Sequence, residues 1–144
     1  MTDAARLRLR LWLQMLKATR HVELEVRERL RLDFDTTLPR FDVLAALSRH
    51  PEGLRLSDLS KDLMVSNGNV TVVVDRLVAD GHVERLPVPG DRRAWQVRLT
   101  EAGNVAIADM ARAHRGWIET MFATLDDAQI AVAIETLTAI RKHP

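Results

Sequence analysis

The segment from Ser66 to Gly103 constrains the fold of this chain more than any other part. Apolar and polar residues alternate over residues 82–88 and again over 95–99, which is typical of β-strands. A Pro-Gly-Asp-Arg-Arg stretch, residues 89–93, joins the two runs as a turn. With helix boundaries on either side, the pattern predicts a helix, a β-hairpin and a second helix in that order.

The helix predicted ahead of the hairpin contains the β-branched run Val70–Val74, which local propensity alone would assign to a strand. Two boundary signals favour a helix instead. Ser66 is a typical N-cap, and Asp80-Gly81 is a typical helix end. A helix over residues 66–79 would bury residues three and four positions apart, and these are Val70, Val73, Val74 and Leu77.

The spacing of apolar residues predicts helices on both sides of this segment. A long helix covers about residues 6–32, and shorter ones start at Pro39, which suits a first turn, and at Ser57, expected as an N-cap. Thr100 and Asp126 begin two more. A helix as long as the first needs a surface to pack on, either its own domain or, as we favour, a second copy of the chain.

Composition excludes several classes of function. The 144 residues include no cysteine, so disulfides, thiolate metal sites and cysteine catalysis are absent. The chain has no nucleophile–base constellation, no glycine-rich phosphate loop and no histidine spacing typical of a metal site. We therefore expect no enzyme, no cofactor and no metal. No apolar run is long enough to span a bilayer and no secretory signal is present, which predicts a cytoplasmic protein without a membrane partner.

The net charge is only +1, so any attraction to nucleic acid must come from a local positive field. The stretch from residue 82 to residue 98 has a small basic excess, with four arginines against two acidic residues: Arg85, Arg92, Arg93 and Arg98 against Glu84 and Asp91. Two of these arginines, Arg92 and Arg93, lie together at the predicted hairpin tip.

The hairpin sequence resembles a known signature. The stretch Asp91–Thr100, D-R-R-A-W-Q-V-R-L-T, followed by Gly103, is similar to the wing motif D-x-R-x-x-x-V-x-L-T-x-x-G of the MarR family of bacterial transcription regulators. Residues 70–77 and 81–85 resemble that family's recognition helix and first wing strand. The resemblance covers nearly the whole chain and implies a mainly α fold with a small β-hairpin wing. This is a winged helix-turn-helix with N- and C-terminal dimerisation helices.

From the resemblance we expect three parts, which are a dimerisation helix (1–34), a DNA-binding lobe (35–100) and C-terminal dimerisation helices (101–144). The implied function is a homodimeric regulator, a repressor of transcription, that binds a pseudo-palindromic operator in double-stranded DNA. A small aromatic acid or its acyl-CoA thioester would release it. The alternative is a winged helix that contacts only proteins, which gives no reason for two arginines at the wing tip.

The predicted DNA contacts come from one helix and the wing. Asparagine can bond adenine in a bidentate way, and valine or threonine methyls can meet a thymine methyl. A wing arginine can enter a narrow minor groove. We favour Arg93 for that role and Arg92 for phosphates, or the reverse, with Asp91 bracing the wing through an arginine pair. The candidate DNA-binding residues are Ser66, Asn67, Gly68, Asn69, Thr71, Val72, Asp75, Arg76, Arg92 and Arg93. The alternative for the asparagines is that they only cap and solubilise the helix.

A second set of residues is a candidate effector pocket between the dimer helices and the DNA-binding lobe. Large apolar side chains would receive an aromatic effector, and arginine would attract an anionic one. The set comprises Trp12, Met15, Arg20, Met110, His114 and Trp117. Each is also an ordinary core or surface residue at its helical spacing, as is Trp95, which we expect to pack against the predicted recognition helix or its support.

Overall fold

The computed structural model describes residues 1–143. Within them the chain forms a mostly helical structure with one small antiparallel sheet. The elements in chain order are α1 (Asp3–Phe34), α2 (Leu38–Ser48), β1 (Leu54–Arg55), α3 (Leu56–Leu63), α4 (Asn67–Ala79), β2 (Val83–Val88), β3 (Asp91–Leu99), α5 (Glu101–Met121) and α6 (Asp127–Arg141). The predicted mainly α fold with a β-hairpin wing is confirmed.

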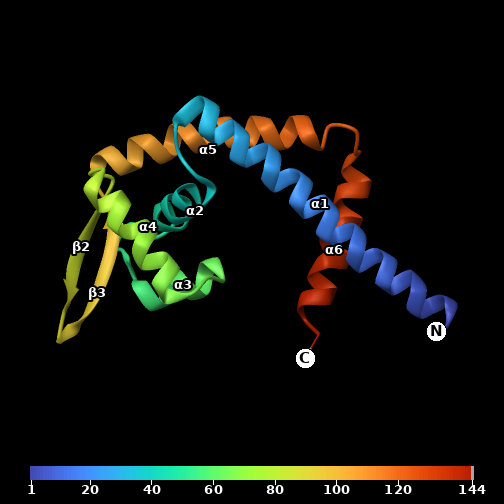
Figure 1. The fold of residues 1–144 in the computed structure, drawn as a ribbon, viewed down its shortest axis with the longest axis horizontal. Helices are drawn as coiled ribbons and strands as arrows, with labels where there is room; N and C mark the ends of the chain where they lie inside the picture. The colour runs from blue at the N-terminus through green and yellow to red at the C-terminus, as the bar shows by residue number, and fades with distance from the viewer. Residues whose placement is uncertain (144) are drawn as a thin grey trace.

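Figure 1 shows a lobe formed by α2, α3, α4 and the sheet, with α5 running along one side of it. The hairpin of β2 and β3 projects from this lobe away from α5 (Figure 1). The N-terminal part of α1 and the whole of α6 extend beyond the lobe at the opposite end of the molecule (Figure 1). No helix within residues 1–143 is both long and apolar enough to cross a membrane.

The conflict over residues 70–74 is resolved in favour of the helix. Ser66 is the N-cap of α4, and its side-chain oxygen accepts a hydrogen bond from the Asn69 backbone N–H at 3.2 Å. The face that buries Val70, Val74 and Leu77 is almost completely excluded from solvent, whereas Val73 is partly buried. Burial of this apolar face therefore outweighs the weak strand preference of the β-branched residues.

The other predicted helix starts are confirmed with one exception. Thr37 caps α2 with Pro39 in its first turn, Thr100 caps α5, and Asp126 forms a capping box with Gln129 at α6. The prediction that Ser57 caps α3 is wrong.

The cause of the exception lies in the sheet. Strand β1 pairs Arg55 with Gln96 of β3, so the backbone is still extended at Arg55 and turns directly into the helix at Leu56. Arg55 thereby becomes the N-cap, without a side-chain hydrogen bond to the helix end, and Ser57 lies inside the first turn.

The sheet has the order β1-β3-β2, with all strands antiparallel. Strand β2 lies at an edge, as its prolines predicted, since proline cannot donate to a ladder. Val83 pairs with Leu99 and Pro87 with Trp95, and the register becomes irregular after Pro87. The chain between Val88 and Trp95 therefore belongs to the wing tip rather than to the regular ladder.

One hydrophobic core holds the lobe together. It combines the C-terminal part of α1 with α2, α3, α4, the sheet and the first half of α5. Its largest fully buried side chains are Leu30, Leu44, Leu47, Leu59 and Leu77. Helix α6 buries no residue in this core, and the N-terminal half of α1 leaves Trp12 and four of its leucines exposed: Leu7, Leu9, Leu11 and Leu13. These two segments thus present apolar surface that the single chain does not cover.

Candidate nucleic-acid interface

The face of α4 opposite the core is exposed from its first residue. Asn67, Gly68, Asn69 and Asp75 are accessible to solvent, and Val72 keeps 70% of its surface exposed. No atom would lie within 4 Å of a side-chain carbon at Gly68, so another backbone can approach the helix there. This face combines amide groups, a bare backbone position and an apolar side chain, which are the types of group that read base edges in the major groove.

The two asparagines are free to bind a partner. Ser66 already provides the N-cap, and the amide side chains of Asn67 and Asn69 make no hydrogen bond within residues 1–143. The alternative that they cap the helix is therefore not what this structure shows. Thr71 is only partly exposed, and its hydroxyl donates to the Asn67 carbonyl at 2.8 Å.

Two candidate residues further along α4 have partners inside the protein. Asp75 forms an ion pair with Arg85 of β2, which connects α4 directly to the wing. Arg76 pairs with Asp80 one turn later, at 3.1 Å. Because Arg85 offsets the charge of Asp75, this carboxylate repels a nearby phosphate less than a free one would.

The wing tip presents two free cations. Gly90 adopts a φ of +80°, which glycine tolerates and which turns the chain into β3. The Asp91 carboxylate then accepts a hydrogen bond from the Arg93 backbone N–H at 3.0 Å. Arg92 and Arg93 are exposed, and their guanidinium groups have no partner among residues 1–143.

Two expectations about the wing need correction. Asp91 braces the tip through the backbone and not through an arginine pair, because a two-residue separation lets the carboxylate reach the N–H of Arg93 directly. Trp95 is 50% exposed, opposite Pro87 near the irregular end of the hairpin, rather than packed away against the recognition helix. The hairpin projects away from the lobe (Figure 1), which agrees with the exposure of this side chain.

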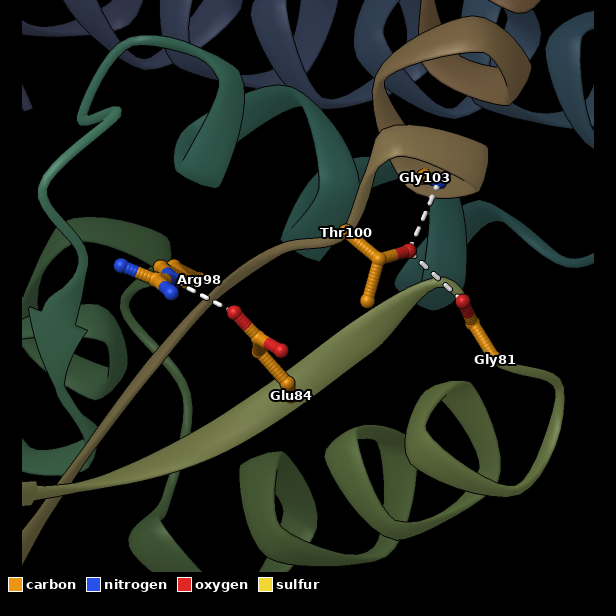
Figure 2. Close-up of polar contacts among 5 residues, drawn as sticks. All are labelled: Gly81, Glu84, Arg98, Thr100 and Gly103. Atoms are coloured by element: carbon orange, nitrogen blue, oxygen red, sulfur yellow. Dashed lines mark hydrogen bonds and ion pairs between the residues drawn. The ribbon is translucent and has the colours of Figure 1, made fainter.

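The base of the wing is fixed to α4 and α5. Figure 2 shows Thr100 between two backbone groups: its hydroxyl donates to the Gly81 carbonyl at 2.6 Å and accepts from the Gly103 N–H at 3.1 Å. On the neighbouring strand positions Arg98 and Glu84 form an ion pair across the hairpin (Figure 2). These contacts hold the wing and the end of α4 at a defined position relative to α5.

The six residues predicted for an effector pocket fall into two groups within one protomer. His114 and Trp117 lie on α5 with Met110, and their rings neighbour Phe41 and Phe34 respectively. Burial lowers the pKa of His114, which is partly buried. The other three, Trp12, Met15 and Arg20, lie on α1. Along the axis of this helix, Trp12 is about 30 Å from Phe34, the α1 residue whose ring neighbours Trp117.

A cavity that sequence reasoning missed lies beside α4. It is open to solvent on one side and bounded by α1, α2, the end of α3 and the N-terminal half of α4, and none of the six predicted effector residues lines it. Asp42 of α2 faces it with Glu23 and Arg27 of α1. Burial, and secondly the Glu23 charge, raise the pKa of Asp42 to about 6, although Arg27 acts in the opposite direction. In the sequence, the one sign of this cavity was Asp42 itself, a charged residue within an otherwise apolar stretch of α2.

Comparison with known proteins agrees with this architecture. A model of the MarR family matches residues 34–94. The HTH-type transcriptional repressor IacR of Pseudomonas putida is 34% identical over 103 residues, which are 72% of this chain and 61% of the relative. The chain spans about half the length of the first curated relatives it matches, between 46% and 61%.

Solved structures match over nearly the full length. A MarR family transcriptional regulator from Silicibacter pomeroyi has a TM-score of 0.84 and 29% identity, covering 99% of this chain and 98% of that one. A MarR variant from Escherichia coli in complex with operator DNA has a TM-score of 0.84 and 25% identity, covering 96% and 99%. With its wing, its capped helix α4 and these matches, the chain has the winged helix-turn-helix fold of the MarR family of transcriptional regulators and is similar to that family in sequence.

Proposed function

We propose that the protein binds double-stranded DNA as a homodimer and represses transcription from the bound operator. The observation that carries the proposal is the placement of free groups on one lobe. Asn67 and Asn69 have unpaired amides at the start of α4, and Arg92 and Arg93 have unpaired guanidinium groups at the wing tip. A helix with free amides fits the major groove, and a hairpin with free arginines fits the adjacent minor groove.

The charge distribution determines how such a protein gains affinity. Residues 51–100 carry seven basic and seven acidic side chains, so the lobe has no general positive field. Ion pairs engage Arg76, Arg85 and Arg98, which leaves the wing-tip arginines as the main free cations of the hairpin. DNA affinity must therefore come from a small number of specific contacts, and the two-fold symmetry of a dimer would double each of them.

The exposed apolar segments support the dimer. Soluble proteins rarely leave large contiguous apolar patches in water, and such patches mark association surfaces. Here they lie on the N-terminal half of α1, the end of α5 and α6, far from the DNA-binding lobe (Figure 1). The residues are Leu7, Leu9, Leu11, Trp12, Leu13, Phe122, Leu125, Val132, Ile134, Leu137 and Ile140. Pairing through them would present two α4 helices to successive major grooves, roughly 34–36 Å apart, so the operator should be a pseudo-palindrome.

Release by a small molecule is part of the same proposal. A ligand changes DNA affinity only if it binds better to a dimer whose α4 helices no longer match the groove spacing. The family resemblance suggests an aromatic acid or its acyl thioester for this role. The residues expected to hold it are those of α1 and α5 given above, at a site separate from the cavity beside α4.

Fluorescence anisotropy with the DNA upstream of the protein's own gene tests the proposal. We expect salt-sensitive binding that is lost when one half of the palindrome is scrambled. Asn67→Ala and Asn69→Ala should reduce the preference for the intact operator over the scrambled one. Arg92→Ala with Arg93→Ala should weaken binding to both sequences.

Arg115→Ala is the matched control, since Arg115 is an exposed arginine on α5, outside α4 and the wing. It should bind DNA like the unmodified protein. A protein that shows no palindrome-dependent binding at low salt would contradict DNA recognition. A promoter–reporter fusion then tests the sign of regulation, and a rise in expression when the protein is supplied would contradict repression.

A further inference from the structure

The wing carries one large apolar side chain that the protein itself leaves in water. Trp95 of β3 keeps 50% of its surface exposed, and its indole N–H makes no hydrogen bond within residues 1–143. Tryptophan combines a broad apolar ring with a single hydrogen-bond donor, and both contribute to binding when a partner covers them. Trp95 is therefore a candidate contact residue, and its surroundings indicate which partner covers it.

The register of the hairpin places this ring on the side of the wing that faces α4. Directly opposed residues of an antiparallel pair lie on the same face of the sheet, and so do residues two apart along a strand. Trp95 opposes Pro87, and Arg85 opposes Val97. Arg85 in turn forms the ion pair with Asp75 of α4. The indole therefore lies on the α4-facing side of the wing, about 7 Å nearer the tip than Arg85.

The other large apolar side chains that the DNA-binding lobe exposes lie beside or on the same helix. Within residues 35–100 they are Met64, Val65 and Val72, which belong to the turn before α4 and to α4 itself. The remaining large apolar residues of the lobe are at least partly buried. The exposed apolar groups of the lobe are thus confined to the turn, α4 and the wing, the three parts that would face DNA.

We propose that Trp95 contacts the sugar–phosphate strand of duplex DNA between the two grooves, an inference that rests on the proposed DNA-binding function. When α4 occupies a major groove and the wing tip the adjacent minor groove, one backbone strand runs between them, along the α4-facing side of the wing. The indole N–H donates to a phosphate oxygen, and the ring packs on the apolar edge of a deoxyribose. Arg93, two residues away at the tip, has a free guanidinium group that attracts the same strand.

The chemistry of the indole favours the backbone over a base or a protein. Its N–H can donate but not accept, and phosphate oxygens only accept, so the two groups are complementary. In a duplex the bases are stacked on one another, so no base face is open to the ring as it would be in a single strand. A protein partner would have to approach beside the free guanidinium groups of the tip, which attract a polyanion instead. The contact carries no base information and fixes the position of the wing relative to α4.

Fluorescence anisotropy with the full chain and the intact operator tests the contact. Trp95→Phe keeps a ring but removes the donor, and it should weaken binding about tenfold, because a dimer loses two hydrogen bonds. Trp95→Ala also removes the ring and should weaken binding by about tenfold more. Neither variant should change the preference for the intact over the scrambled operator. The salt slope should also stay unchanged, because a neutral indole displaces no counterion.

Leu32→Ala is the matched control, since Leu32 is an exposed apolar residue of α1, outside α4, the wing and the apolar patch assigned to the dimer. It should bind the operator like the unmodified protein, and circular dichroism confirms that each variant is folded. A folded Trp95→Ala variant that binds as tightly as Leu32→Ala would overturn the inference. A smaller salt slope for Trp95→Phe would also overturn it, because the effect would then act through the arginines.

Tryptophan fluorescence locates the indole independently of affinity. At saturating operator, DNA should shield Trp95 from quenching by acrylamide. The chain has two further tryptophans, Trp12 and Trp117, so the contribution of Trp95 is the shielding that the Trp95→Phe variant lacks. Operator binding by the unmodified protein is measured first, and its failure contradicts the proposed function on which this inference rests. Intact operator binding with equal shielding in both proteins contradicts this inference alone.

Discussion

Gly103 of α5 lies against the backbone of His82 so closely that a side-chain carbon at position 103 would be 2.0 Å from the His82 carbonyl oxygen. The same carbonyl accepts a hydrogen bond from the Thr100 N–H at 3.0 Å. The first turn of α5 is therefore seated directly on the turn between α4 and β2. Only a residue without a side chain permits this approach, which explains the glycine at the end of the wing motif in physical terms.

Substitution of Gly103→Ala should destabilise the protein strongly. The clash involves backbone atoms, which cannot move aside as the end of a flexible side chain can, so the cost should reach about 3 kcal/mol or more. Urea unfolding followed by circular dichroism measures it. The variant should unfold at a clearly lower urea concentration than the unmodified protein.

Gly116→Ala provides the control within the same helix. A side-chain carbon at position 116 would meet no atom within 4 Å, so alanine should stabilise the helix by about 0.5–1 kcal/mol through its better propensity. Equal unfolding midpoints for the Gly103 and Gly116 variants would mean that the close approach to His82 does not hold in solution.

Most of the fold could be predicted because its signals are local. Side chains that cap a helix act within three residues, and the alternation of a strand is visible in the strand itself. Ser66, Thr100 and Asp126 all start the helices they were predicted to start. Ser57 failed because pairing between Arg55 and the distant Gln96 decides where the backbone leaves the sheet.

The site was predicted less completely because part of it depends on distant segments meeting. The exposed face of α4 follows from helical periodicity, and the tip arginines follow from the turn. The ion pair between Asp75 and Arg85 depends on the angle between α4 and β2. The cavity at Asp42 depends on how α1 packs across α2. Neither the angle nor the packing is encoded within a single periodic segment.

The salt dependence of DNA binding should identify the roles of the two wing arginines. Each phosphate contact contributes about 0.9 to the slope of log affinity against log salt, so Arg92→Ala should reduce the slope of a dimer by about 2. Arg93→Ala should lower affinity more, and most for operators with an A·T-rich segment under the wing, where the minor groove is narrow. Anisotropy titrations at several KCl concentrations measure both effects. If Arg92 shows the A·T dependence instead, the two roles are exchanged.

Asp42 should make stability fall as the pH rises from about 4 to about 6. Its carboxyl has a pKa of about 6 in the folded protein, against an ordinary value of 3.8. Between these values the folded state binds more protons than the unfolded state, so the free energy of unfolding decreases with rising pH. Because the group is only half buried, solvent screening should limit the loss to about 1 kcal/mol. Urea unfolding at several pH values measures this slope.

The variant Asp42→Asn isolates this contribution. Asparagine does not titrate, so the variant should lose less stability than the unmodified protein between about pH 4 and about pH 7. Its stability relative to the unmodified protein should therefore improve with rising pH. Parallel pH profiles for the two proteins would show that the Asp42 carboxyl ionises at its ordinary pKa.

A charge on the exposed apolar face of α6 should separate the dimer without unfolding the protomer. Ile134 keeps 60% of its surface exposed in the single chain and belongs to no part of the core, so Ile134→Glu removes no internal packing. In a two-fold dimer the substitution places two carboxylates in an apolar interface, which is unfavourable for association. Light scattering after size exclusion should give the mass of one chain for this variant and of two for the control Glu135→Gln, a neighbouring exposed position. Operator affinity should fall with the loss of the second half-site contact, and an Ile134→Glu protein that remains dimeric would place the interface elsewhere.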